Sequence, residues 1–283
     1  MLRIALPNKG RLADDTRGLF EDAGLSIRSR GDRALTASLG GEFEAIFVRA
    51  QDIPEFVADG AAHAGVTGWD LVAESERRLE TLLDLEYGAC RLVVAAHEES
   101  AVRCLDDLLD ARAPFRVATV FPRLAHRFFE DQGCPATIVP VSGACEVAPH
   151  LGIADIVVDL TSTGSTLKIN GLREITTVLE STARLVAAPG AKGLDELVTA
   201  LSSVLRARSM RYLMANVPRD ALDRVTTVLP GLNGPTVIDI LNGGSMVAVH
   251  AVVASNTVYR TIGALRGLGA KGILVTRIER LMP

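Results

Sequence analysis

Short apolar runs alternate with helix-like segments from the start of this 283-residue chain, and this alternation constrains its fold more than any other feature. The patterns predict strands at Leu2–Leu6, Phe43–Val48 and Ala64–Val66, with helices at Leu12–Ala23 and Asp52–Ala58 between them. Aromatic residues make up only 4% of the chain, so Ala, Val, Leu and Ile must build the core. A β-α-β-α-β succession with such a core is typical of a sheet that is buried on both faces by helices.

A second succession of the same kind begins near Cys90. Strands are predicted at Leu92–Ala96, Arg116–Thr119, Thr137–Val141, Ile153–Val158, Glu174–Leu179 and Arg184–Ala187. Helices are predicted at Leu105–Leu109, Pro122–Asp131, Ala144–Leu151 and Leu194–Arg208. The two successions share a design in which a Gly ends a helix and an apolar strand leads into a small-residue turn with an acid. Two explanations stay open: any two α/β units look alike, or the chain forms two similar lobes with ligand at the carboxyl ends of their strands.

The last segment differs from both successions. It predicts a strand at Arg211–Val217, a helix from Arg219, a hairpin of Thr236–Leu241 with Met246–Val253 around Asn242-Gly243-Gly244, a helix at Asn256–Leu268 and a strand at Gly272–Arg277. The order β-α-β-β-α-β is that of the ferredoxin-like unit, which often serves as a regulatory module.

Composition excludes several classes of protein. The formal net charge of −4 predicts no general attraction to nucleic acid or to an anionic membrane. The first ten residues are too soon interrupted for a signal peptide, and no apolar stretch approaches the roughly 20 residues of a membrane helix. Cys-x-x-Cys pairs are absent from the sequence, so reduced thiols in a cytoplasmic protein are expected for Cys90, Cys104, Cys134 and Cys145.

The sharpest chemical signal is the segment Asp159–Leu167, which reads Asp-Leu-Thr-Ser-Thr-Gly-Ser-Thr-Leu. It follows an apolar strand and precedes a predicted helix, so its amides and hydroxyls converge where a phosphate monoester would be bound. Asp159 at the end of the strand can accept hydrogen bonds from sugar hydroxyls beside that phosphate. The segment therefore suits a ribose 5-phosphate group, and the structural alternative is a Ser/Thr-rich cap on an ordinary helix.

The wider segment from Glu146 through Gly152, Asp155 and Asp159 to Leu167 resembles the signature of the ATP phosphoribosyltransferase family. The resemblance covers the whole chain, with further landmarks at Pro7–Leu12, Arg49–Pro54, Gly65–Leu71, Pro230–Thr236 and Gly269–Gly272. It implies two periplasmic-binding-protein type II-like lobes with parallel or mixed sheets and a C-terminal ferredoxin-like domain, as in the long form of the family. The expected boundaries are 1–88 with 180–210 for lobe I, 89–179 for lobe II and 211–283 for the regulatory domain.

The resemblance also implies the reaction. N1 of the ATP adenine attacks C1 of phosphoribosyl diphosphate, diphosphate leaves, and histidine synthesis begins. The implied catalytic residues are Lys9, Arg49 and Asp159. The implied substrate-binding residues are Arg11, Asp70, Glu146, Asp155, Thr161, Ser162, Thr163, Gly164, Ser165 and Thr166, with Leu232, Thr236 and Gly272 at a histidine inhibitor site. Mg²⁺ is expected to enter with the substrates, without a metal site of the protein, and dimers that assemble into hexamers are expected.

The sequence departs from the family pattern in two places. Gln51 stands where some relatives have Lys, which weakens the expected charge contact to phosphate. The segment Asn216-Val217-Pro218 lacks an acid before Pro that would pair with the amino group of histidine. Two rival functions also remain at this level: a non-catalytic binding protein built from two lobes, and a phosphoribosyltransferase that uses another base.

Overall fold

The computed structural model describes residues 1–29, 31, 34–110, 113–241 and 244–282. The chain divides into two compact units, one formed by residues 1–21 and 25–194 and the other by residues 22–24 and 195–283. Among these described residues, the first unit contains two sheets and the second contains one. The boundaries expected within these units, at residues 88/89, 179/180 and 210/211, stay predictions.

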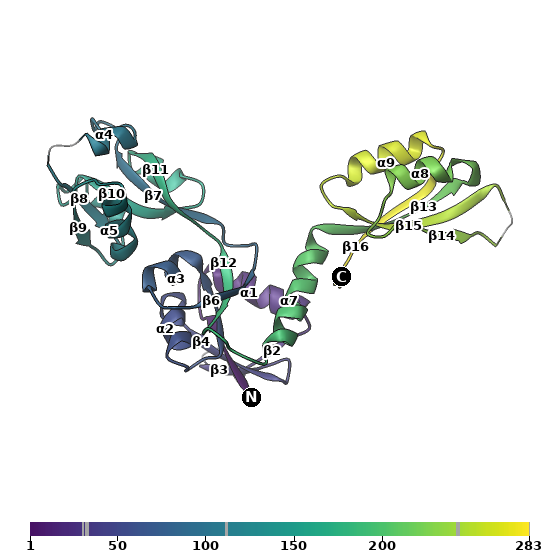
Figure 1. Cartoon of the computed structure of the whole chain (residues 1–283), viewed down its shortest axis with the longest axis horizontal. Coiled ribbons are helices and arrows are strands. Elements are labelled where there is room, and N and C mark those ends of the chain that lie inside the picture. Colours follow the sequence, from purple (N-terminus) through teal and green to yellow (C-terminus); the bar gives the residue numbers. More distant parts are fainter. Residues whose placement is uncertain (30, 32–33, 111–112, 242–243, 283) are drawn as a thin grey trace. The chain divides into compact units, whose positions relative to one another are not determined.

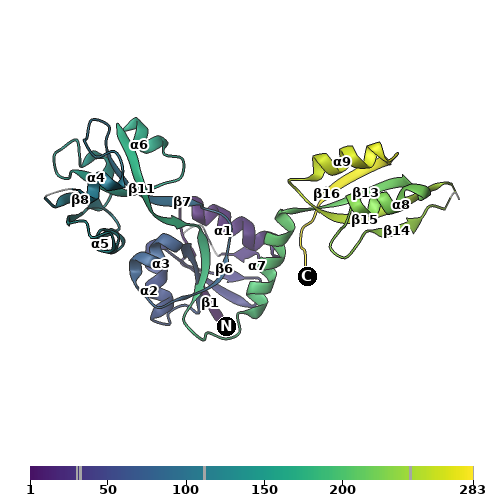
Figure 2. The same cartoon turned by 45° about the horizontal axis from the view of Figure 1, so that its top comes forward.

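The first sheet, which we call lobe I, has seven strands in the order β2-β3-β4-β1-β5-β12-β6. Its strands are β1 (Leu2–Pro7), β2 (Ile27–Arg28), β3 (Thr36–Leu39), β4 (Phe43–Val48), β5 (Ala64–Gly68), β6 (Glu80–Asp84) and β12 (Ala183–Ala187). Strand β1 is parallel to both β4 and β5. Helix α1 (Arg11–Asp22) lies on one face of this sheet, and α2 (Ile53–Ala58) and α3 (Trp69–Ser75) lie on the other (Figure 2).

The second sheet, which we call lobe II, has five strands in the order β11-β7-β10-β8-β9. They are β7 (Cys90–His97), β8 (Phe115–Thr119), β9 (Ala136–Pro140), β10 (Ile156–Thr161) and β11 (Leu172–Ser181), with helices α4 (Leu105–Leu109), α5 (Pro122–Asp131) and α6 (Ser165–Ile169). Leu92 and Val94 of β7 belong to one buried cluster, and Val93 and Ala95 to another. Both faces of the sheet are therefore buried, as the apolar runs predicted.

The chain crosses between the two lobes at two places. Residues 85–89 lead from β6 into β7, and Thr182 alone separates β11 from β12. The crossings are tied together, because the N–H of Leu85 donates to the Ala183 carbonyl and the N–H of Ala183 donates to the Tyr87 carbonyl, each at 2.9 Å. We call these two crossings the hinge.

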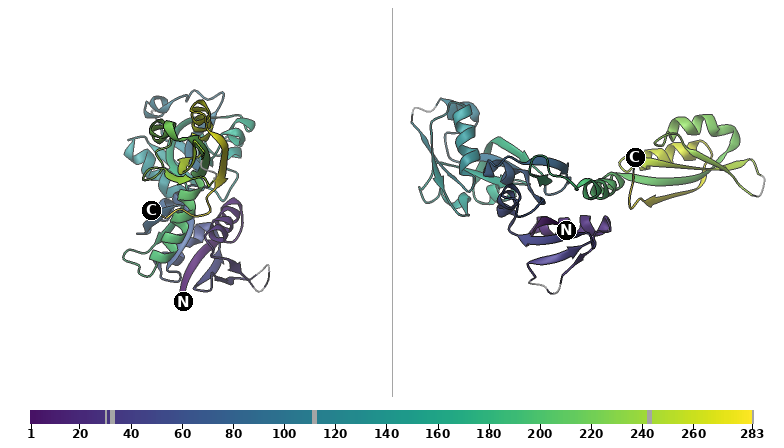
Figure 3. Two further views of the ribbon diagram at one scale, coloured as in Figure 1. Left: turned by 90° about the vertical axis from the view of Figure 1, so that its right-hand side faces the viewer. Right: turned by 60° about the horizontal axis from the view of Figure 1, so that its bottom comes forward.

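The second compact unit contains α7 (Asp195–Arg208) and a four-stranded antiparallel sheet in the order β14-β15-β13-β16. The sheet strands are β13 (Met210–Pro218), β14 (Thr236–Asp239), β15 (Met246–Ala254) and β16 (Lys271–Arg277). Helices α8 (Leu222–Val228) and α9 (Val258–Gly267) cover one face of this sheet (Figure 1), and the right-hand view of Figure 3 shows the same two layers from another direction. The predicted ferredoxin-like β-α-β-β-α-β order is confirmed, while part of the predicted hairpin turn, Asn242-Gly243, lies outside the described residues.

Two predicted elements of lobe II were wrong. The helix predicted at Ala144–Leu151 is only a 3₁₀ turn at Cys145–Val147, entered through Ala144 at a left-handed φ of 51°. The strand predicted at Ile153–Val158 is β10, Ile156–Thr161, displaced toward the C-terminus. The displacement arises because Asp155 binds Arg116 at the strand entry, while residues 159–161 continue the ladder opposite Val93, Leu92 and Arg91. Three other strands, β2, β3 and β6, were not predicted.

Candidate active site

A cavity of about 390 Å³ opens where the carboxyl ends of β1 and β10 face each other within the first unit. Lobe I contributes the turn after β1, where Gly10 has a φ of +83° that favours glycine and its carbonyl accepts the N–H of Ala13 at the start of α1. Lobe II contributes the segment after β10. The cavity is lined by Lys9, Gly10, Arg11, Leu12, Ala50, Gly68, Asp70, Gly88, Cys90, Leu160, Thr161 and Ser162. Five predicted site residues thus share one cavity: Lys9, Arg11, Asp70, Thr161 and Ser162.

The hydroxyl-rich segment after β10, Thr161–Thr166, is held in shape by its own side chains, and we call it the hydroxyl loop. The buried Thr161 hydroxyl oxygen accepts the N–H of Gly164 at 2.8 Å, and Gly164 has a left-handed φ of +76°. The hydroxyls of Thr163 and Ser165 bond each other at 2.8 Å. Helix α6 has only five residues, so its dipole is small. Anion binding here would therefore rest on loop amides and the exposed hydroxyls of Ser162, Thr163, Ser165 and Thr166.

Two acids lie close together beside this loop. Asp159 is half-buried within β10 and accepts the N–H of Leu160 at 2.7 Å. Burial raises the pKa of Asp159, and the charge of Glu146 raises it further. The thiol of Cys145 shares this corner, where burial, followed by the charge of Asp159, raises its pKa to about 11. Hydrogen bonds to an ionised carboxylate stabilise it, and sugar hydroxyls can donate such bonds.

Asp155 lies elsewhere. Its carboxylate accepts the backbone N–H of Arg116 at 2.9 Å and the Arg116 guanidinium at 2.7 Å. The hydrogen bond from the Arg116 side chain holds the pKa of Asp155 below its ordinary value. Asp155 precedes the first residue of β10 and Thr161 ends that strand, so about 20 Å of extended chain separates them. The structure therefore does not bring Asp155 to the hydroxyl loop.

Asp70 is the buried acid of the cavity, 5% exposed, in the first turn of α3. Its carboxylate accepts the hydroxyl of Ser181 at 2.5 Å, and its N–H donates back to the same hydroxyl oxygen at 3.0 Å. Burial raises the pKa of Asp70, and the Ser181 hydrogen bond opposes that rise. Burial, followed by the charge of Asp70, also raises the pKa of Cys90.

Arg49 lies at the edge of this arrangement. It is exposed and immediately precedes Ala50, which lines the cavity. The carbonyl of Ala50 accepts the Thr67 hydroxyl at 2.7 Å, which ties the Arg49 segment to β5. Arg49 itself does not line the cavity, and neither does its neighbour Gln51.

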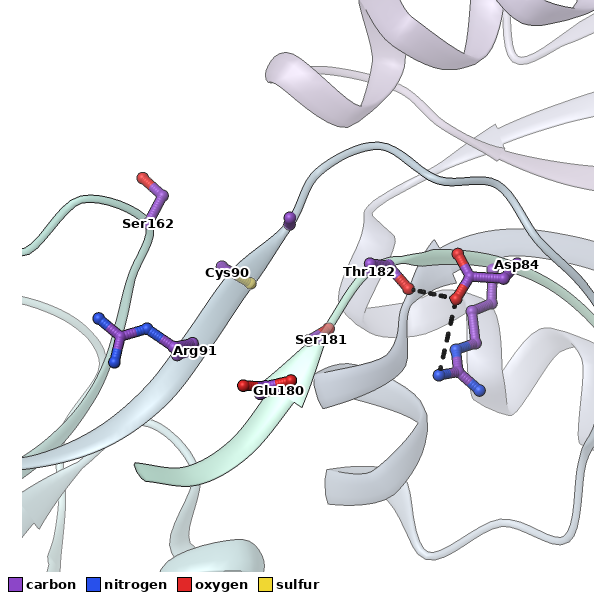
Figure 4. A pocket seen from close by; sticks show the side chains of 9 residues that line it. Asp84, Cys90, Arg91, Ser162, Glu180, Ser181 and Thr182 are labelled. Carbon is purple, nitrogen blue, oxygen red and sulfur yellow. Dashed lines mark hydrogen bonds and ion pairs between the residues drawn. The ribbon is translucent and has the colours of Figure 1, made fainter. Parts of the chain in front are cut away.

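A second cavity of about 430 Å³ adjoins the first and shares Cys90 and Ser162 with it. Figure 4 shows Cys90 and Ser181 on neighbouring strands and Ser162 on the hydroxyl loop, and all three residues line this second cavity. Sequence analysis assigned no function to Cys90, Gly88 or Ser181. Their sequence context carries no motif, since only the pairing of β7 with β11 brings residues 90 and 181 together.

The three residues predicted for an inhibitor site belong to the sheet domain of the second unit. Leu232 is 53% exposed in the turn before β14, Thr236 begins β14, and Gly272 lies in β16 with a φ of +58°. Strands β14 and β16 are the opposite edges of the sheet, about 14 Å apart at the usual strand spacing. A single chain therefore does not bring Thr236 and Gly272 together.

These features define a class: a two-lobed α/β protein with cationic residues and a hydroxyl-rich loop lining one cavity, and with a ferredoxin-like domain in its second compact unit. Comparison with known proteins specifies the family. Residues 49–207 match the family model for ATP phosphoribosyltransferase, and residues 207–280 match the model for the HisG C-terminal domain. The chain belongs to the ATP phosphoribosyltransferase family, the pentosyltransferases that begin histidine biosynthesis, in the form that carries the C-terminal domain.

Individual relatives agree with this assignment. An ATP phosphoribosyltransferase of Gemmatimonas aurantiaca is 69% identical over all of both chains, and one of Natronomonas pharaonis is 48% identical, again over all of both. Among solved structures, the ATP phosphoribosyl transferase (HisG:HisZ) complex from Thermotoga maritima aligns with a TM-score of 0.59 and 28% identity, covering 67% of this chain and 88% of that one. Within the described residues, no helix is long and apolar enough to cross a membrane.

Proposed function

We propose that the cavity between Lys9 and the hydroxyl loop binds phosphoribosyl diphosphate and ATP and transfers the phosphoribosyl group to N1 of the adenine. The observation that supports this assignment is the shared lining of one cavity by Lys9, Arg11, Thr161 and Ser162. The loop would bind the 5-phosphate through amides and hydroxyls, and Lys9 and Arg11 would bind the diphosphate.

The chemistry needs positioning more than proton transfer. The lone pair of neutral adenine N1 forms a bond to C1 of the ribose while the C1–O bond breaks and its electron pair leaves with diphosphate. Positive charge grows on the sugar and negative charge on the leaving group. Asp159, with Glu146 beside it, would hold the ribose hydroxyls near the developing cation, and Arg49 and Lys9 would stabilise the diphosphate.

Magnesium would enter as part of the substrate. Mg²⁺ in phosphoryl sites usually keeps several waters and is held by substrate phosphates with one or two carboxylates. Among the described residues, no group of three or more His, Cys, Asp or Glu side chains could hold a metal ion. Asp159 and Glu146 would be the carboxylates available to a magnesium–diphosphate complex.

The proposal also includes inhibition of the enzyme by histidine, assembly of the chain into a homo-oligomer and a cytoplasmic location. Thr236 and Gly272 lie on opposite edges of one sheet, so a histidine site built from both would take one edge from each of two copies. This geometry favours an inhibitor site that exists only in an assembly, and the expected dimers and hexamers would provide it. The missing acid before Pro218 would leave the histidine amino group to other acceptors.

The rival functions make different predictions in one assay. The pure protein is mixed with ATP, phosphoribosyl diphosphate and Mg²⁺, and near-ultraviolet absorbance is followed before and after histidine is added. A non-catalytic binding protein would release no diphosphate, and an enzyme for another base would leave ATP unchanged. Formation of phosphoribosyl-ATP is the expected result.

Two variants test the hydroxyl loop within that assay. Replacing Thr163 and Thr166 by Val should raise the KM for phosphoribosyl diphosphate about a hundredfold or more, because two hydrogen bonds to a charged group are lost and each contributes about 1.5–3 kcal/mol. The KM for ATP should change little. Thr137→Val on the exposed side of β9 is a matched control and should leave both constants unchanged. Equal effects of the loop variants on both substrates would contradict the phosphate assignment.

A further inference from the structure

Ser181 and Asp70 form a buried pair at the hinge. Their exposed fractions are 4% and 5%, and two hydrogen bonds of 2.5 and 3.0 Å join them. Ser181 is the last residue of β11, in the strand that leads from lobe II to lobe I, and Asp70 is in α3 of lobe I. The pair therefore joins an acid of the cavity to the strand that connects the lobes.

The carboxylate of Asp70 has little freedom to move. A Cβ atom at Gly68, the residue before α3, would lie 2.3 Å from Asp70 Oδ1, so the glycine leaves room for this carboxylate. The Ser181 hydroxyl holds the carboxylate from the other direction at 2.5 Å. Together they fix where the acid reaches the cavity wall.

Ser181 and Thr182, where the chain crosses from β11 to β12, also hold the backbone of α3. The N–H of Trp69 donates to the Thr182 carbonyl at 3.0 Å, and the N–H of Asp70 donates to the Ser181 hydroxyl oxygen. Two first-turn amides, which have no partner inside a helix, thus find their acceptors on the hinge. The orientation of α3, and with it the direction of Asp70, depends on the path of residues 181–182.

The opposite end of α3 is bound to lobe II. The carboxylate of Glu74 accepts the backbone N–H groups of Arg123 and Leu124 at 3.0 and 2.9 Å, at the start of α5. Helix α3 is therefore fastened at its first turn to the hinge and at its last turn to lobe II. A change in the path of residues 181–182 would therefore reorient Asp70, which lines the cavity.

We propose that Ser181 is a positioning residue that orients the Asp70 carboxylate for the adenosine part of ATP and thereby couples the hinge to nucleotide binding. This proposal rests on the proposed function, in which Asp70 contacts the nucleotide. Without the Ser181 hydroxyl, Asp70 loses the hydrogen bond that directs its carboxylate.

The experiment is a double-mutant cycle on the full-length protein with Ser181→Ala, Asp70→Asn and the double variant. Ser181→Ala should raise the KM for ATP about tenfold, the scale of one hydrogen bond to a charged group, and leave the KM for phosphoribosyl diphosphate within about twofold. In the Asp70→Asn background, Ser181→Ala should have no further effect, because the group on which Ser181 acts is already altered.

Three controls make the cycle decisive. Ser203→Ala removes a similarly buried serine hydroxyl, which bonds the Ala200 carbonyl within α7, and should leave the KM for ATP unchanged. Ser181→Cys, which is close in size and has only a weak donor, replaces Ser181→Ala if the latter does not fold. It should raise the KM for ATP in the wild-type background and leave it unchanged in the Asp70→Asn background. Thermal melting of each variant confirms that it is folded.

The outcomes distinguish failure of the positioning role of Ser181 from failure of the proposed function. Equal losses from Ser181→Ala in the wild-type and Asp70→Asn backgrounds would overturn the positioning role, and so would an unchanged KM for ATP in Ser181→Ala. An Asp70→Asn variant with wild-type kinetics would overturn both the role of Asp70 and the inference drawn from it. A wild-type protein that forms no phosphoribosyl-ATP would overturn the proposed function itself.

Discussion

The contact between Glu74 and α5 leads to a quantitative prediction about stability. Helix α5 begins after Phe121, which makes no side-chain cap, and two of its first-turn amides bond to the Glu74 carboxylate instead. A side-chain cap contributes about 1 kcal/mol, and a negative charge at a helix N-terminus adds about 0.3–1 kcal/mol. Glu74→Ala should therefore lower the free energy of unfolding by about 2 kcal/mol, which is about 4–8 °C in Tm for a unit of this size.

Calorimetry of Glu74→Ala, Glu74→Gln and wild type would measure this loss. Glu74→Gln keeps one acceptor oxygen and loses the charge, so its Tm should lie between the other two. Glu130→Ala is the matched control, because this exposed acid in the last turn of α5 has one ion pair among the described residues, with His126 at 3.5 Å, and should shift Tm by less than about 1 °C. A Glu74→Ala variant that melts with wild type, or a Glu130→Ala variant that loses as much, would refute the capping argument.

Three further results are expected. Asp155→Asn should destabilise the protein at neutral pH. The Arg116 hydrogen bond lowers the pKa of Asp155, so the ionised carboxylate stabilises the folded state above the ordinary pKa of about 3.9. This stabilisation is lost as the pH falls through the folded-state pKa. The Tm difference from wild type should close below about pH 4, and a constant difference down to pH 3 would contradict this. Iodoacetamide at pH 8 should label exposed Cys104 and spare Cys145, whose pKa burial raises to about 11, as peptide mass spectrometry would show; equal labelling would argue against it. Truncation before Arg211 should abolish histidine inhibition and retain some turnover, and inhibition that survives truncation would place the sensor elsewhere.

Much of the fold followed from local pattern. The predicted bounds Phe43–Val48, Leu105–Leu109 and Pro122–Asp131 match β4, α4 and α5. These segments have apolar runs or helical spacing with clear ends, so short-range preferences and burial agree. Strand β6, Glu80–Asp84, escaped prediction because it is a partly exposed edge strand with acids at both ends. The Cys145–Val147 turn escaped because the left-handed Ala144 has no sequence signature.

The chemistry of the hydroxyl loop follows from local sequence, because its threonines, serines and Gly164 are consecutive and shape one turn through their own hydrogen bonds. Which acids lie near that turn depends instead on how distant segments pack together. Asp155 and Asp159 are four residues apart in sequence, yet the direction of β10 sends Asp155 to Arg116 at the opposite end of the strand. Asp70 and Ser181 are 111 residues apart, yet they share hydrogen bonds. The reason is physical: burial of both sheet faces sets strand register and crossing points, and those long-range contacts are not encoded in any local pattern.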